Sequence, residues 1–139
     1  MKGDHILYRE RRYKYQLLIP YSLDISIKGY VVDNEFFSLD ESGRLTINAL
    51  YAWDGPSGPT VDTPSFMRGS LVHDVLYQMI RLELLPAKLK EVADQILYDL
   101  CIEDGMWSVR AKWVLRAVDH YGAGSCIPGS DTKDVKTAP

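Results

Sequence analysis

The chain has 139 residues, which is long enough for one domain with a buried core. Its hydrophobic fraction of 46% and charged fraction of 25% are those of an ordinary globular protein, and a net charge of −3 gives no electrostatic reason to expect nucleic-acid binding. No apolar run approaches the roughly 20 residues needed to span a bilayer, and the first 16 residues lack the apolar core of a signal peptide.

The first half of the chain is predicted to form antiparallel β-strands. Segments 13–27 (YKYQLLIPYSLDISI) and 29–37 (GYVVDNEFF) are rich in aromatic and β-branched residues, and Pro20 interrupts the first of them. Segment 38–53 (SLDESGRLTINALYAW) is typical of a hairpin, because a turn sequence at 40–43 precedes alternating apolar and polar residues.

The second half is predicted to be helical. A first helix should run from residue 64 to about residue 85, because Pro86 stops it. A second helix is expected over residues 87–104, ending near Gly105, and a third over residues 109–121. The glycine- and proline-rich segment that precedes these helices predicts a stiff loop without regular structure.

We therefore expect an α+β fold, with N-terminal antiparallel strands and a hairpin followed by a three-helix segment. Residues 1–122 are expected to form a single domain, and residues 123–139 a polar C-terminal tail. Only two cysteines occur, Cys101 and Cys126, and a disulfide framework is not expected from them.

The segment SLVHDVLY (70–77) places polar residues in an otherwise apolar helix. A helix that is apolar nearly all round is buried, so His73 and Tyr77 should face protein. Adjacent residues point about 100° apart on a helix, so His73 and Asp74 should serve different partners. Two interpretations stay open for the pair. The first is that His73 and Asp74 form a functional site. The second is that both are structural: His73 is a buried histidine hydrogen-bonded to a neighbouring carboxylate, and Asp74 accepts hydrogen bonds from backbone amides of the preceding loop.

The order of these motifs resembles that of the calcium-dependent phospholipases A-two. It consists of a glycine-containing loop (WDGPSGP, 53–59), the HDVLY segment (73–77) and an ADQIL segment (93–97) on the next helix. The likeness is to the disulfide-free viral and prokaryotic forms, and it implies an antiparallel pair formed by the first two helices. The region from the hairpin to Gly122 also resembles a bacteriophage and prophage family of unknown function, whose hallmark is Ala/Ser-x-x-His-Asp-x-Leu-Tyr. This second resemblance covers more of the chain.

The phospholipase resemblance implies catalytic roles for three residues. His73 would be the general base that takes a proton from the attacking water. Asp94 would fix the tautomer of the imidazole and stabilise its cation, and Tyr77 would hydrogen-bond this aspartate. Helix geometry places Asp94 and Asp99 equally near the position opposite His73, so geometry does not distinguish them. The motif alone favours Asp94.

The same resemblance implies a calcium site. Asp74 would bind calcium together with backbone carbonyls of the loop around Trp53, Gly55 and Ser57 or Gly58, since calcium prefers several hard oxygen ligands. The metal would polarise the carbonyl of the substrate and bind its oxyanion.

Two functions are consistent with this sequence. The first is a phage-encoded, calcium-assisted hydrolase that acts on a lipid or a related ester. The second is a non-catalytic virion or tail-associated protein that uses the same scaffold and binds other phage proteins. In both cases we expect synthesis in the host cytoplasm, and association with the virion is consistent with the second.

Overall fold

A computed structural model describes residue 6, residues 8–9, 15–53 and 64–121. These residues form two compact units, with the strands within Ile6–Asp54 and the helices within Gly55–Thr132. The order of strands first and helices second confirms the predicted α+β fold. The single domain expected over residues 1–122 stays a prediction, and the predicted tail at 123–139 lies outside the described residues.

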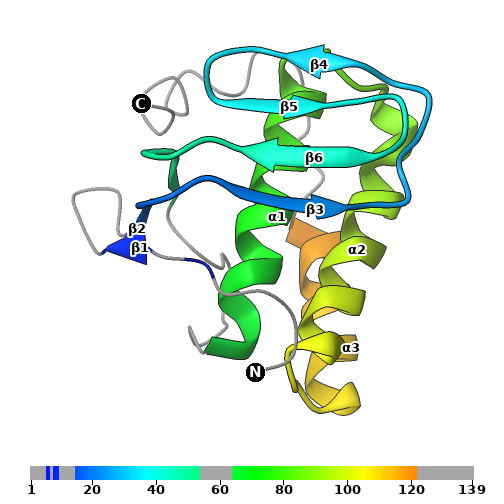
Figure 1. Cartoon of the computed structure of the whole chain (residues 1–139). Coiled ribbons are helices and arrows are strands. Elements are labelled where there is room, and N and C mark those ends of the chain that lie inside the picture. Colours follow the sequence, from blue (N-terminus) through cyan, green and yellow to red (C-terminus); the bar gives the residue numbers. More distant parts are fainter. Residues whose placement is uncertain (1–5, 7, 10–14, 54–63, 122–139) are drawn as a thin grey trace. The chain divides into compact units, whose positions relative to one another are not determined.

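The strand unit has a three-stranded and a four-stranded sheet, both antiparallel in the described residues (Figure 1). The first has the strand order β1-β2-β7 and the second the order β3-β6-β5-β4. The strands are β1 (Tyr8–Arg9), β2 (Tyr15–Leu17), β3 (Tyr21–Asp24), β4 (Val32–Asp33), β5 (Phe37–Leu39), β6 (Arg44–Ile47) and β7 (Ala52–Trp53).

The predicted hairpin is formed by β5 and β6. Leu39 lies opposite Leu45 in this pair, and both side chains are buried, as the alternation of apolar and polar residues predicts. The turn between the strands requires glycine at position 43, where φ is +94° and a Cβ atom would clash with the carbonyl oxygen of Ile25.

The helical unit contains α1 (Pro64–Arg81), a short 3₁₀ helix η1 (Ala87–Leu89), α2 (Lys90–Glu103) and α3 (Ser108–Tyr121) (Figure 1). The second predicted helix is therefore divided, because its first residues form the 3₁₀ turn that follows Pro86. None of the helices in the described part of the chain is both long and apolar enough to cross a membrane.

The predicted end of the first helix was wrong by about one turn. α1 ends at Arg81 because Glu83 adopts a left-handed conformation, with φ of +61°. The backbone amide of Leu84 then donates to the carbonyl of Met79 at 2.8 Å, which closes the helix well before Pro86. Leu84 therefore lies outside the helix, and its side chain is exposed.

The helices α1 and α2 pack antiparallel, as expected. Arg68 near the start of α1 bonds to Asp104 just after the end of α2, whereas His73, farther along α1, bonds to Asp94, earlier in α2. Contacts that advance along one helix and recede along the other define an antiparallel pair. This register positions the candidate site.

Close packing of the two helices occurs at Gly69. A Cβ atom there would lie 2.9 Å from Cδ1 of Leu97 and 3.2 Å from Sγ of Cys101, so glycine allows α2 to approach the backbone of α1. Cys101 is a free thiol in this contact. Burial raises its pKa to about 12, and the nearby Asp104 carboxylate adds to this effect. The thiol is therefore protonated and unreactive at neutral pH.

The third helix closes the core of the helical unit. Its inner face is apolar and packs against α1 and α2 in a single cluster of buried side chains. The members of this cluster are Phe66, Leu97, Cys101, Met106, Ala111 and Val114.

Candidate functional site

The centre of the candidate site is formed by two residues one turn apart on α1. His73 and Tyr77 lie on the same face of the helix, and their ring centroids are 3.9 Å apart with an angle of 45° between the planes. Both side chains are buried, with His73 only 6% exposed, which confirms the prediction that they face protein.

Asp94 on α2 joins the two rings. Its Oδ1 atom accepts a hydrogen bond from Nε2 of His73 at 2.7 Å and another from the hydroxyl of Tyr77 at 2.5 Å. The side chain of Asp94 is 3% exposed. Asp99, the alternative partner, is exposed instead and accepts a hydrogen bond from the amide of Gln95 at 3.0 Å. The expected contact of His73 with Asp94 is therefore confirmed, whereas the catalytic roles of these residues stay predictions.

Two further charged residues belong to this network, and the sequence analysis missed both. Nζ of Lys90 donates to Oδ2 of Asp94 at 2.9 Å and lies 3.4 Å from Oδ1 of Asp119 on α3. The spacing of Lys90 and Asp94, four residues apart on one helix, is a signal that could have identified the first contact. No comparable signal predicts the contact with Asp119, which depends on how α3 packs.

The carboxylate of Asp94 is ionised at neutral pH. Burial pushes the pKa of Asp94 upward, but hydrogen bonds from His73, Tyr77 and Lys90 outweigh burial, and the resulting pKa lies below the ordinary value of 3.8. Burial lowers the pKa of Lys90, but the contacts with Asp94 and Asp119 raise it by more than burial lowers it. The pKa of Lys90 therefore lies above its ordinary value. The contact between Lys90 and Asp94 is therefore an ion pair.

The ionised carboxylate also determines the state of the imidazole. Burial lowers the pKa of His73 below 6.5 despite the opposing effect of Asp94, so the ring is neutral at pH 7. An ionised carboxylate can only accept, so the proton of the neutral ring is on Nε2, and Nδ1 carries the lone pair. Within the described residues no hydrogen bond engages Nδ1. This nitrogen can act as a base.

The lowered pKa of His73 predicts a loss of stability in mild acid. The unfolded chain takes up a proton near the ordinary histidine pKa of 6.5, whereas the folded chain does so only at lower pH, so stability is greatest above 6.5 and falls as the pH drops below it. We expect the free energy of unfolding in urea to fall between about pH 7.5 and 5.5, and to fall less steeply in His73→Gln. If the free energy of unfolding fell equally steeply with decreasing pH in the wild type and in His73→Gln, His73 would not be a neutral, buried residue.

The structure describes only part of the predicted calcium site. Asp74 lies half-buried on α1 and carries oxygen atoms of the kind that calcium prefers. Trp53 is in β7 of the strand unit, where its ring packs on Tyr15 with centroids 5.6 Å apart. Gly55, Ser57 and Gly58 lie outside the described residues. Among the described side chains, no group of three or more histidines, cysteines or acids is arranged to hold a metal ion. The calcium site stays a prediction.

A cavity of about 320 Å³ lies between α2 and α3 and reaches the buried network from the carboxylate side. Asp94 is part of its wall, and His73 is not. The other lining residues are Glu91, Gln95, Leu115, Arg116 and Asp119.

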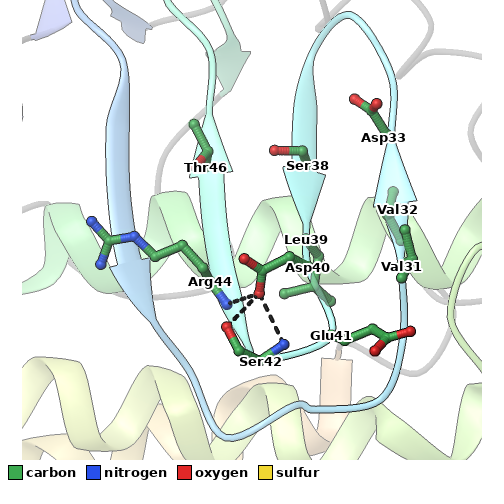
Figure 2. Close-up of a pocket in the computed structure, with 10 residues that line it drawn as sticks. All are labelled: Val31, Val32, Asp33, Ser38, Leu39, Asp40, Glu41, Ser42, Arg44 and Thr46. Carbon is green, nitrogen blue, oxygen red and sulfur yellow. Dashed lines mark hydrogen bonds between the residues drawn. The ribbon is translucent and has the colours of Figure 1, made fainter.

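A larger cavity of about 640 Å³ lies on the strand unit around the turn between β5 and β6 (Figure 2). The carboxylate of Asp40 in its wall accepts hydrogen bonds from the backbone amides of Ser42 and Arg44 and from the hydroxyl of Ser42. These bonds, the hydroxyl bond first, lower the pKa of Asp40. The guanidinium of Arg44 extends to Asp24 at 3.3 Å. The charged groups around this turn therefore stabilise the turn and the sheet, and we assign no chemistry to them.

Comparisons of the chain with protein-family models, with curated proteins and with solved structures find no match.

Proposed function

We propose that this chain is a phage-encoded ester hydrolase in which His73 is the general base. The observation that carries the proposal is the arrangement of His73, Asp94 and Tyr77, which leaves Nδ1 of the imidazole with a lone pair and without a hydrogen bond in the described residues. A neutral imidazole held in one tautomer by an ionised carboxylate is the arrangement that general-base catalysis requires.

In the proposed reaction, Nδ1 of His73 removes a proton from a water molecule, and the water oxygen attacks the carbonyl carbon of the ester. Asp94 stabilises the imidazolium that forms, since the two groups are 2.7 Å apart and both are buried. The bond to the leaving alcohol then breaks, and the alkoxide takes the proton back from Nδ1. Tyr77 and Lys90 keep the carboxylate in place through hydrogen bonds to its two oxygens.

The proposal includes calcium as a bound metal. Asp74 would supply a carboxylate ligand, and calcium bound there would polarise the ester carbonyl. Lipids of a bacterial envelope are the substrate class that the sequence resemblance favours.

Hydrolysis of phospholipid vesicles in the presence and absence of calcium tests this function. We expect calcium-dependent release of fatty acid by the wild-type protein and a loss of at least about 100-fold in kcat/KM for His73→Gln, because the general base is removed. Asp99→Asn, on the exposed side of α2, serves as the control and should leave kcat/KM within about two-fold.

Calcium titration tests the proposed metal site independently of the general base. Asp74→Asn is expected to weaken calcium binding about ten-fold or more, whereas Asp99→Asn on the exposed side of α2 should bind as the wild type does. A folded wild-type protein that neither binds calcium nor hydrolyses esters would end the hydrolase proposal.

Near-complete burial of the site favours a second candidate function. His73 and Asp94 are 6% and 2% exposed, and Lys90 already neutralises the carboxylate, as in a network that only stabilises a scaffold. On this alternative the chain is a non-catalytic virion or tail-associated component that binds other phage proteins. Co-sedimentation with phage particles supports it, and recovery only as free monomer contradicts it.

A further inference from the structure

The outer face of α3 carries large exposed apolar side chains, although the helix already has an apolar inner face in the core. Trp107, whose carbonyl accepts the first hydrogen bond of the helix from Ala111, is 84% exposed. Val109 and Trp113, four residues apart and therefore on the same face, are 79% and 46% exposed. Large exposed apolar groups that gather on one element mark interaction surfaces, since scattered single residues would not align.

The charges of α3 are mostly basic, and its one acidic residue, Asp119, lies in the last turn and contacts Lys90 of α2 at 3.4 Å. Between Gly105 and Val118 the charged residues are Arg110, Lys112 and Arg116, and this segment has no acidic residue, although the whole chain has a net charge of −3. Lys112 and Arg116 are exposed and lie three residues beyond Val109 and Trp113, respectively. The described helices contain no ion pair that engages either of them.

We propose that the outer face of α3 docks on the surface of an anionic lipid bilayer. We call this surface the α3 surface and define it by Val109, Lys112, Trp113 and Arg116 on one face of the helix and by the exposed Trp107 just before the first residue of the helix. The helix would lie in the plane of the bilayer interface, with the indole rings and Val109 inserted among the headgroups and the cations against lipid phosphates.

The composition of the α3 surface favours a bilayer over a protein partner. Tryptophan prefers the boundary between headgroups and acyl chains, because its ring is apolar while its N–H needs a polar partner. Interfacial helices combine such rings with lysine and arginine, and each cation adds attraction to an anionic leaflet. The inner face of α3, with Ala111 and Val114, stays in the core, so docking requires no unfolding.

This inference does not depend on the proposed hydrolase, because binding is measured without turnover. His73→Gln is expected to bind vesicles as the wild type does, even if it has lost all activity. Failure of vesicle binding and failure of hydrolysis are therefore separate results.

Co-sedimentation with vesicles tests the α3 surface in the full-length protein. We expect binding to phosphatidylcholine vesicles that contain phosphatidylglycerol, and at least about ten-fold weaker binding to pure phosphatidylcholine. Trp107→Ser should weaken binding to the anionic vesicles about ten-fold and Lys112→Gln about five-fold. Both positions are exposed, so the variants should unfold in urea at the same midpoint as the wild type.

Two matched controls are available. Val31→Ser removes an apolar side chain that is exposed in the strand unit, and Lys88→Gln removes an exposed cation from η1. Both should bind vesicles as the wild type does. Equal binding by all variants, or no binding to anionic vesicles, would overturn the proposal. So would a wild-type oligomer that Trp107→Ser converts to monomer without any effect on vesicles, because the α3 surface would then be a contact between copies of the chain.

Discussion

Arg68→Met is expected to lower the free energy of unfolding by about 3–5 kcal/mol, because it breaks a buried ion pair and leaves one partner in place. The guanidinium of Arg68 donates from Nε and Nη2 to the two oxygens of Asp104, both at 3.0 Å, and Nη2 is also 2.9 Å from Oε1 of Glu103. The side chains of Arg68 and Asp104 are both buried. Urea unfolding measured by circular dichroism gives the change.

The exposed pair of Arg44 and Asp24 provides the matched control. Its Nη1–Oδ1 distance is 3.3 Å, but both side chains are largely exposed, so Arg44→Met should cost less than about 1 kcal/mol. The double variant Arg68→Met/Asp104→Leu should recover part of the stability that Arg68→Met loses, because no buried charge is left behind. Equal losses for Arg68→Met and Arg44→Met would contradict this account.

The second large effect is expected at Asp94. Asp94→Ala removes the acceptor of three donors, on His73, Tyr77 and Lys90, and these groups lie at a buried position where water cannot replace the carboxylate fully. Unsatisfied buried polar groups are costly, so we expect a loss of about 3–5 kcal/mol in the free energy of unfolding.

Asp99→Ala is the control for this prediction, because it makes the same change five residues later on α2. Asp99 is exposed and bonds only to Gln95 in the contacts described, so its removal should change the free energy of unfolding by less than about 0.5 kcal/mol. If the two variants lose the same stability, Asp94 does not hold the helices together in the way that its contacts indicate.

Local features of the fold were predictable from the sequence because their signals lie within a few residues. The turn between β5 and β6 requires a glycine with positive φ, and Asp40 and Gly43 stand at the positions that such a turn needs. The end of α2 near Gly105 follows in the same way, since φ is +97° there. The end of α1 was not predictable, because Glu83 carries no comparable signal for its left-handed conformation.

The partner of His73 was only half predictable. Position 77 is one turn away on the same helix, so the contact of His73 with Tyr77 follows from helix geometry alone. Asp94 and Asp99 are five residues apart and therefore lie on different faces of α2. Which of them meets His73 depends on which face of α2 packs against α1. The motif favoured Asp94, and the packing at Gly69 brings that face of α2 against α1.

The sequence by itself determined which segments are strands or helices and that His73 and Tyr77 share a buried face, because both depend on backbone periodicity. Only the tertiary structure decided that Arg68 pairs with Asp104 and that Lys90 bridges Asp94 and Asp119. The contacts of Arg68 with Asp104 and of Lys90 with Asp119 join segments that are distant in the sequence, so they depend on how the helices pack, and the buried charge of Arg68 requires such a partner.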